Sequence, residues 1–188
     1  PAGTLDENQP QVAADPYGHV YVAWWVSGVY GSGGGIYLAF SNNNGITFQS
    51  PIHMPVVSTN GGSTNNFIEM SPDIAADEKR VYLVWYGYSD TTYEYNILYT
   101  YANISSDTSS LSASNFITPR VINDDIVSNQ HTEHQTHPKI AVAGGNVVVV
   151  WNDFRDENGF NEFMTDKKFS NNQYTQKMWK TLNDNSSV

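Results

Sequence analysis

The sequence contains no cysteine and is poor in charged residues. Without cysteine, the chain has no disulfide framework, no thiolate metal site and no cysteine nucleophile. Charged residues make up 15% of the chain, below the ~25% of an ordinary soluble domain. Helix-rich proteins usually carry more lysine and glutamate, so this shortage favours β structure.

Basic residues are especially scarce, with 9 Lys and Arg against 19 Asp and Glu, for a formal net charge of −10. Nucleic-acid phosphates need a basic footprint, and anionic membranes attract basic segments, so the composition argues against nucleic-acid binding and against membrane association. The longest apolar runs, Val20–Val26 and Val147–Trp151, are far shorter than the ~20 residues of a membrane span, which argues against membrane insertion.

What the sequence does contain is enough chain and enough aromatic residues for one packed domain. It has 188 residues, of which 13% are aromatic, and this aromatic share argues against disorder. At ~100–200 residues per domain, we predict a single domain over residues 1–188. The chain starts at Pro1 and shows no signal-peptide h-region, so we expect it to be processed or cut from something longer.

One sequence pattern occurs three times. A proline opens a short apolar segment, and a tryptophan closes a second one 13 or 14 residues later, at Pro10 and Trp24, Pro72 and Trp85, and Pro138 and Trp151. The prolines are 62 and 66 residues apart. Agreement in both sequence and spacing indicates a repeat architecture.

Each repeat predicts four short strands. The first strands are predicted at Val12–Ala14, Ile74–Ala76 and Ile140–Val142, and the second at Val20–Trp24, Val81–Trp85 and Val147–Trp151. The third are predicted at Ile36–Ser41, Ile97–Ala102 and Glu162–Ser170, and the fourth at Ile46–Gln49, Phe116–Thr118 and Tyr174–Met178. The second strands are apolar on both sides, so both faces of each sheet should be covered.

A repeated four-stranded antiparallel sheet that is covered on both faces indicates stacked sheets, and their radial form is the β-propeller. We therefore predict an all-β fold of three propeller blades, at about residues 8–58, 68–122 and 136–182, with the repeated tryptophans filling the gaps between blades. The alternative is a β-sandwich with three chance tryptophan matches, although a sandwich needs no repeated sequence.

A distinctive turn is predicted between the third and fourth strands of the first repeat. It reads Ser41-Asn-Asn43-Asn-Gly45-Ile-Thr47-Phe48, in which Gly45 permits the backbone of the turn and the Ser and Asn side chains can bond its N–H groups. Phe48 is predicted to pack back under the hairpin. This segment resembles the Asp-box of the sialidase-like (BNR-repeat) superfamily, with Asn43 in place of the usual aspartate.

The later repeats keep less of this turn. The second has a Ser-rich insertion at Asn103–Asn115, and the third keeps the remnant Ser170–Asn172. The resemblance implies propellers of six or seven blades, so three blades cannot close by themselves. Closure is expected from a homodimeric six-bladed ring, from further blades of a longer polypeptide, or from pairing of the open edges with a partner. The Asp-box itself is structural and indicates fold, not function.

One face of such a propeller holds the loops between strands two and three and the loops between blades. In this chain it should hold the candidate ligand-binding residues Asp90, Tyr93, Glu94, Tyr95, Asp153, Phe154, Arg155, Asp156 and Glu157. Rings that cover apolar sugar faces, next to carboxylates that accept hydroxyl protons, suit sugar recognition. The alternative is that Phe154 and Arg155 cover the sheet end while the acids are merely solvated.

The enzymes of the superfamily use three arginines, a Tyr–Glu nucleophile pair and an acid/base aspartate. This chain has only Arg80, Arg120 and Arg155, and Arg80 falls on the opposite face, so no catalytic residue is assigned. We expect non-enzymatic binding of a glycan or a cell-surface protein, together with assembly. The alternative is a sialidase-like glycoside hydrolase fragment whose remaining active-site residues lie outside this chain.

Two groups of residues offer ligands for a divalent cation. His131, Glu133, His134 and His137 lie within seven residues and suit zinc or another borderline metal, provided that the loop folds back. Asp124-Asp125 and Asp153–Asn158 supply oxygen ligands for calcium, without the spacing of an EF-hand. The alternatives are a polar inter-blade loop and solvated acids.

Asn103-Ile-Ser105 and Asn185-Ser-Ser187 are N-glycosylation sequons. They are compatible with an extracellular or cell-surface protein, as are the absence of cysteine and the habits of the superfamily.

Overall fold

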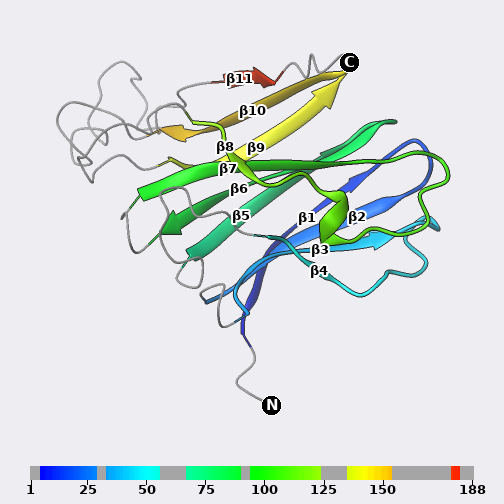
Figure 1. The fold of residues 1–188 in the computed structure, drawn as a ribbon, viewed down its shortest axis with the longest axis horizontal. Coiled ribbons are helices and arrows are strands. Elements are labelled where there is room, and N and C mark those ends of the chain that lie inside the picture. The colour runs from blue at the N-terminus through cyan, green and yellow to red at the C-terminus, as the bar shows by residue number, and fades with distance from the viewer. Residues whose placement is uncertain are drawn as a thin grey trace, which may run out of the picture.

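The computed structural model describes residues 5–28, 33–55, 67–89, 94–123, 135–153 and 179–182. The strands in these ranges form three antiparallel sheets that stand side by side (Figure 1). The helix among them is a single 3-10 turn, η3 (Ala113–Asn115). Within the described ranges, no helix has the length and apolar character needed to span a membrane.

The strands of each sheet follow one another in chain order. The first sheet consists of β1 (Glu7–Ala14), β2 (Val20–Val26), β3 (Gly35–Ser41) and β4 (Ile52–His53). The second consists of β5 (Phe67–Ala76), β6 (Arg80–Ser89), β7 (Glu94–Asn103) and β8 (Arg120–Val121). The third consists of β9 (Gln135–Ala143), β10 (Asn146–Asp153) and β11 (Trp179–Leu182), with β10 in the middle. This up-and-down order is that of propeller blades, as predicted.

The predicted fourth strands are wrong in position. Ile46–Gln49 belongs to the Asp-box turn, because Thr47 is hydrogen-bonded to Asn43 within that turn, and β4 begins only at Ile52. Phe116–Thr118 contributes a single bridge, between Phe116 and Ala102, and β8 follows it.

In the third sheet, β11 pairs directly with β10. The strand that pairs with β10 on the side away from β9 therefore comes from residues 179–182. The predicted strands Glu162–Ser170 and Tyr174–Met178 lie outside the described residues.

The core consists of two apolar layers, one on each side of the second sheet. Alternate residues of β6 enter each layer, because successive side chains of a strand point to opposite faces. Val81, Leu83 and Trp85 pack with side chains of the first sheet. Tyr82, Val84 and Tyr86 pack with side chains of the third sheet. The middle sheet is thus covered on both faces, and Trp85 and Trp151 lie buried between sheets, as predicted. The prediction fails for Trp24, which lies half-buried on the outer face of the first sheet.

The Asp-box turn has the hydrogen bonds that its sequence predicts. The Ser41 hydroxyl accepts from the Gly45 N–H at 3.0 Å. The Asn43 side chain accepts from the Thr47 N–H at 2.9 Å and donates to the Thr47 hydroxyl at 2.8 Å. Gly45 has a φ of 78°, which explains why glycine is needed there. The predicted packing of Phe48 under the hairpin is wrong, since its side chain is 44% exposed.

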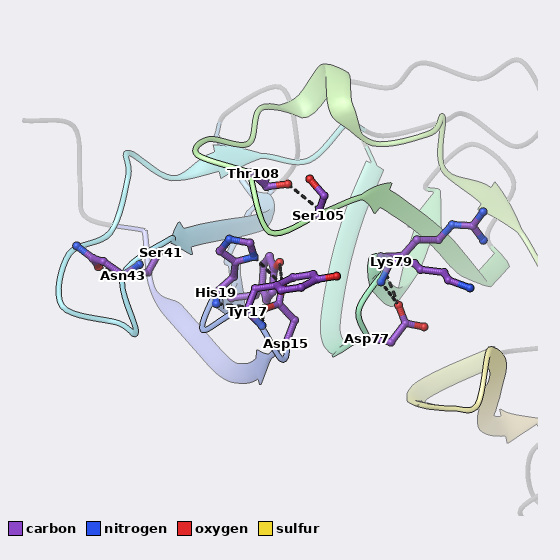
Figure 2. Close-up of polar contacts among 11 residues, drawn as sticks. Asp15, Tyr17, His19, Ser41, Asn43, Asp77, Lys79, Ser105 and Thr108 are labelled. Carbon is purple, nitrogen blue, oxygen red and sulfur yellow. Dashed lines mark hydrogen bonds and ion pairs between the residues drawn. The ribbon is translucent and has the colours of Figure 1, made fainter.

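The turns between first and second strands lie on the same face as the Asp-box, and the Asn44 N–H donates to the Gly18 carbonyl between them. Asp15 organises the first of these turns, accepting from the Tyr17 N–H, the Tyr21 hydroxyl and both the backbone and the ring of His19. In the second sheet, Asp77 accepts from the N–H groups of Lys79 and Arg80 and from the Tyr82 hydroxyl (Figure 2). We call this side of the molecule the turn face.

The Ser-rich insertion of the second repeat lies against the first sheet on the turn face. The Ser109 carbonyl accepts from the side chains of Asn42, at 3.1 Å, and Gln49, at 2.7 Å. Leu111 enters the apolar layer between the two sheets. The insertion therefore fastens two blades together where the second Asp-box has been lost.

Candidate functional site

The other side of the molecule, which we call the loop face, is reached at the beginning of β1, β5 and β9. These three strands are neighbours, one from each sheet (Figure 1). Side chains tie them together. Ser71 donates to the side-chain oxygen of Gln9 at 2.6 Å, and the Asp73 carboxylate accepts from the Ile140 N–H at 2.8 Å. This row of first strands corresponds to the wall of a propeller channel.

Each first strand has a β-bulge next to its repeated proline. The residues before the prolines, Gln9, Ser71 and His137, have φ values of 50°, 48° and 51°. This left-handed conformation is uncommon for residues other than glycine and costs on the order of 1–3 kcal/mol. Backbone strain of this kind gathers at functional sites, and here it recurs at equivalent positions of three blades.

An aromatic cluster surrounds the second and third bulges. The ring of Tyr86 lies 5.4 Å from the ring of His137 and 5.5 Å from that of Tyr95. Tyr88 lies 4.6 Å from Tyr95. Ser71 stands at the second bulge, next to Met70, whose sulfur accepts from the Tyr86 hydroxyl at 3.7 Å. We call Ser71, Tyr86, Tyr88, Tyr95 and His137 the loop-face cluster.

The pKa shifts of His137, Tyr86 and Tyr95 in the loop-face cluster all favour the neutral forms of these side chains. Partial burial, and to a lesser degree the nearby Lys139 ammonium, lower the pKa of His137. Burial raises the pKa of Tyr86 and of Tyr95. The imidazole and the phenols therefore act as neutral hydrogen-bonding groups beside aromatic faces.

A second polar site lies buried between the first and second sheets. The Glu69 carboxyl accepts from the indole N–H of Trp85 at 2.7 Å and from the Ile36 N–H at 3.4 Å. It is fully buried, and this burial raises its pKa to about 8, against the lowering effect of the two hydrogen bonds. His53 lies nearby, with its ring stacked on Tyr37 at 4.4 Å.

The third sheet has an amide in the equivalent place. Gln135 is buried and its side-chain oxygen accepts from the indole N–H of Trp151 at 2.9 Å. Glu69 and Gln135 each stand three residues before a repeated proline, as does Glu7 in the first sheet. We call this pairing of a carboxyl or amide with the tryptophan of its own sheet the junction pair.

Two of the predicted site residues are brought together by the structure. Tyr95, predicted to bind a ligand, and His137, predicted to bind a metal, both contact Tyr86. Glu94 begins β7 opposite Ser89, and Asp153 ends β10 opposite Gln135, so both stand at strand ends toward the loop face. The other predicted ligand-binding residues, Asp90, Tyr93, Phe154, Arg155, Asp156 and Glu157, lie outside the described residues.

Of the predicted metal ligands, His131, Glu133 and His134 lie outside the described residues, as do the candidate calcium ligands Asp124 and Asp125. In the part of the chain that the structure describes, no three His, Asp or Glu side chains come together as a metal site. His137 faces Tyr86 instead.

Asn103, the first predicted glycosylation position, ends β7 and is exposed. Its side-chain oxygen accepts from the Arg80 guanidinium at 3.0 Å, and this guanidinium lies over the ring of Tyr101. Asn185 lies outside the described residues.

Sequence reasoning missed the junction pairs and the left-handed positions. Both had a signal, because each stands at a fixed distance before a proline that the repeat already identified. The chemical types at these positions vary between repeats, and this variation hides them from a search for identical residues.

Comparison with known proteins supports the fold. No protein-family model matches the sequence, and no curated protein does. A protein of unknown function from Dyadobacter fermentans matches with 12% identity and a TM-score of 0.51, over 78% of this chain and 44% of that one. A thermostable family-43 glycoside hydrolase matches with 15% identity and a TM-score of 0.53, over 84% of this chain and 52% of that one.

The Hadza microbial sialidase Hz136 also matches, with 12% identity and a TM-score of 0.47, over 78% of this chain and 42% of that one. The likeness to the family-43 glycoside hydrolase structure supports the predicted fold of consecutive β-propeller blades over the described part of the chain. The chain spans about half the length of the solved structures that it matches.

Proposed function

We propose that this chain is a non-enzymatic β-propeller module that binds a glycan on its loop face, outside the cell or at its surface, and that adjacent blades complete its ring. The observation that carries the proposal is the loop-face cluster, in which the ring of Tyr86 lies against those of Tyr95 and His137. Neutral donors and acceptors beside tyrosine rings match the alternating polar edges and apolar faces of a sugar.

The chemistry of the cluster favours binding over catalysis. Glycoside hydrolysis ordinarily needs two carboxyl groups across the scissile bond, or a tyrosine activated by a neighbouring base. The Tyr86 hydroxyl instead contacts the Met70 sulfur at 3.7 Å, and burial raises its pKa. The likeness to a family-43 glycoside hydrolase keeps a hydrolase fragment as the second candidate.

The test is binding of a panel of neutral and sialylated oligosaccharides to the full chain, followed by ligand-observed NMR. We expect saturable binding that is weakened about fivefold or more by Tyr95→Ala or His137→Ala, since an aromatic contact contributes on the order of 1 kcal/mol. Tyr17→Ala, on the turn face, is the matched control and should change nothing.

Two results would contradict this proposal. Binding that is equally sensitive to Tyr17→Ala would place the ligand elsewhere. Turnover of a sialoside or of another glycoside by the chain would favour the hydrolase.

A further inference from the structure

The middle sheet shows what a covered blade looks like in this protein. Its β6 residues facing the first sheet are Val81, Leu83 and Trp85, and those facing the third sheet are Tyr82, Val84 and Tyr86. All six are buried. Because the repeats align residue by residue, each position of the end sheets can be compared with its equivalent here.

Among the described residues, nothing covers the outer face of the first sheet in this way. Val12 on β1 is 68% exposed, whereas its equivalent on β5, Ile74, is only 6% exposed under the first sheet. Val20, Val22 and Trp24 of β2 are half-buried, whereas their equivalents on β6 are fully buried. An apolar face built like a blade-to-blade junction is therefore open.

Polar groups of this face also lack the hydrogen bonds that their equivalents form in the covered junctions. Trp24 is the equivalent of Trp85 and Trp151, yet its indole N–H is buried and has no acceptor among the described residues. Glu7, the equivalent of Glu69 and Gln135, is exposed. In the covered junction, Glu69 also accepts from the backbone N–H of Ile36 in the preceding sheet. Among the described residues, Glu7 has no equivalent of this donor, which would come from the third strand of a preceding blade.

The third sheet has the complementary opening. Val150 on β10 is 37% exposed, whereas its equivalents Val84 and Ala23 are both fully buried. Val148 beside it is half-buried, whereas its equivalent Tyr82 is buried. This is the face that, in the first and second sheets, packs on the junction tryptophan of the next blade.

We propose that the outer face of the first sheet is the docking surface for the third sheet of a second copy of this chain, and that Glu7 and Trp24 form the third junction pair there. Each copy carries both halves of the junction, so two copies complete one another reciprocally about a two-fold axis. The inference rests on the proposed function only in its statement that adjacent blades complete the ring, and it is independent of glycan binding.

The test is the mass of the full chain by light scattering across a range of concentrations, together with two variants. A charge placed at the centre of an apolar junction is left unpaired there, so Val12→Arg and Val150→Arg should each weaken the dimer at least about 100-fold. Both positions are partly exposed in the single chain, so both variants should fold, as judged by unchanged circular dichroism. Ile46→Arg, at a 79% exposed position on the turn face, is the matched control and should leave the dimer intact.

Mixing the two variants provides a sharper result. A heterodimer of Val12→Arg with Val150→Arg keeps one junction free of both substitutions, so the mixture should recover a 1:1 complex that neither variant forms alone. Failure to recover it would overturn the proposal, as would a wild-type chain that stays monomeric, a dimer that survives Val12→Arg, or an assembly larger than two copies.

The junction pair is tested by a conservative substitution. Glu7→Gln should retain the dimer, because Gln135 already performs this role in the third sheet. Glu7→Ala should weaken it about tenfold by removing the acceptor of the Trp24 indole. Equal behaviour of the two variants would remove Glu7 from the interface. Glycan binding by monomeric variants would show that binding does not depend on the dimer, so each proposal can fail without the other.

Discussion

The two covered junctions of this protein use different side chains to accept the hydrogen bond of a buried indole. Between the first and second sheets, the carboxyl of Glu69 accepts from Trp85. Between the second and third sheets, the amide of Gln135 accepts from Trp151 at nearly the same distance. Each junction thus requires a side chain that accepts from the buried indole N–H and carries no charge. A buried glutamate meets this requirement only while its carboxyl is protonated.

The largest effect expected at the first junction follows from removing its tryptophan. Trp85 is fully buried at the centre of an apolar layer, so Trp85→Ala should lower the free energy of unfolding by about 3–5 kcal/mol. The measurement is denaturant unfolding followed by circular dichroism. Trp151→Ala at the second junction is the comparison and should cost less, because among the described residues the third sheet is covered on one face only. An equal or larger loss at Trp151 would contradict this ranking.

Glu69→Gln should make the two junctions alike. The folded chain keeps the Glu69 proton up to a pKa of about 8, whereas the unfolded chain releases it near the ordinary value of 4.5. Between these values the folded state binds more protons, so the free energy of unfolding falls as pH rises, by at most about 1.4 kcal/mol per pH unit.

The wild-type chain should therefore lose the contribution of Glu69 progressively from about pH 4.5 to about pH 8. The glutamine variant should remove that slope and be more stable at pH 8, as measured by chemical unfolding at several pH values. An unchanged pH profile would show that the carboxylate is ionised in the folded chain.

The reciprocal change, Gln135→Glu, should introduce such a slope at the second junction. The new carboxyl would face the Trp151 indole in a buried place, and its ionisation would be penalised in the same way. We expect near-normal stability at pH 5 and a loss on the order of 1–3 kcal/mol at pH 8, where the carboxyl of the unfolded chain is ionised. Equal stability at both values would mean that water reaches this junction.

A smaller effect is expected at the edge of the first junction. Gly35 has a φ of 130°, and a Cβ there would lie 2.8 Å from Nε2 of His53 and 3.1 Å from Oε2 of Glu69. Gly35→Ala should therefore cost on the order of 1–3 kcal/mol. Thermal unfolding is a sufficient measurement, and Gly145→Ala, which also has a positive φ but nothing near its Cβ, separates backbone strain from the clash.

Much of the fold could be predicted because each repeat shows the same short sequence pattern of a proline, two apolar runs and a tryptophan. Short apolar runs at a fixed distance after each repeated proline identified the first and second strands of every sheet, and the Asp-box segment placed the turn after β3. The fourth strands were missed because they are only two residues long, at Ile52–His53 and Arg120–Val121, and pairing with the third strand sets them, not their own composition.

The candidate site was harder to predict, because its members come together only through contacts between sheets. Tyr95 and His137 were each assigned to separate groups, and Tyr86, which joins them, looks in the sequence like an ordinary strand residue. Glu69 looks like a solvated acid, since nothing in its neighbourhood along the chain reveals that the first sheet buries it.

The three left-handed positions before Pro10, Pro72 and Pro138 have a consequence for how this protein can change. The bulge is the same whether the residue is Gln9, Ser71 or His137, so the backbone there does not depend on the side chain that it carries. Each blade therefore offers one interchangeable position at the bulge of its first strand. A new specificity can be assembled one blade at a time, by selection or by an engineer, while the scaffold underneath keeps its shape.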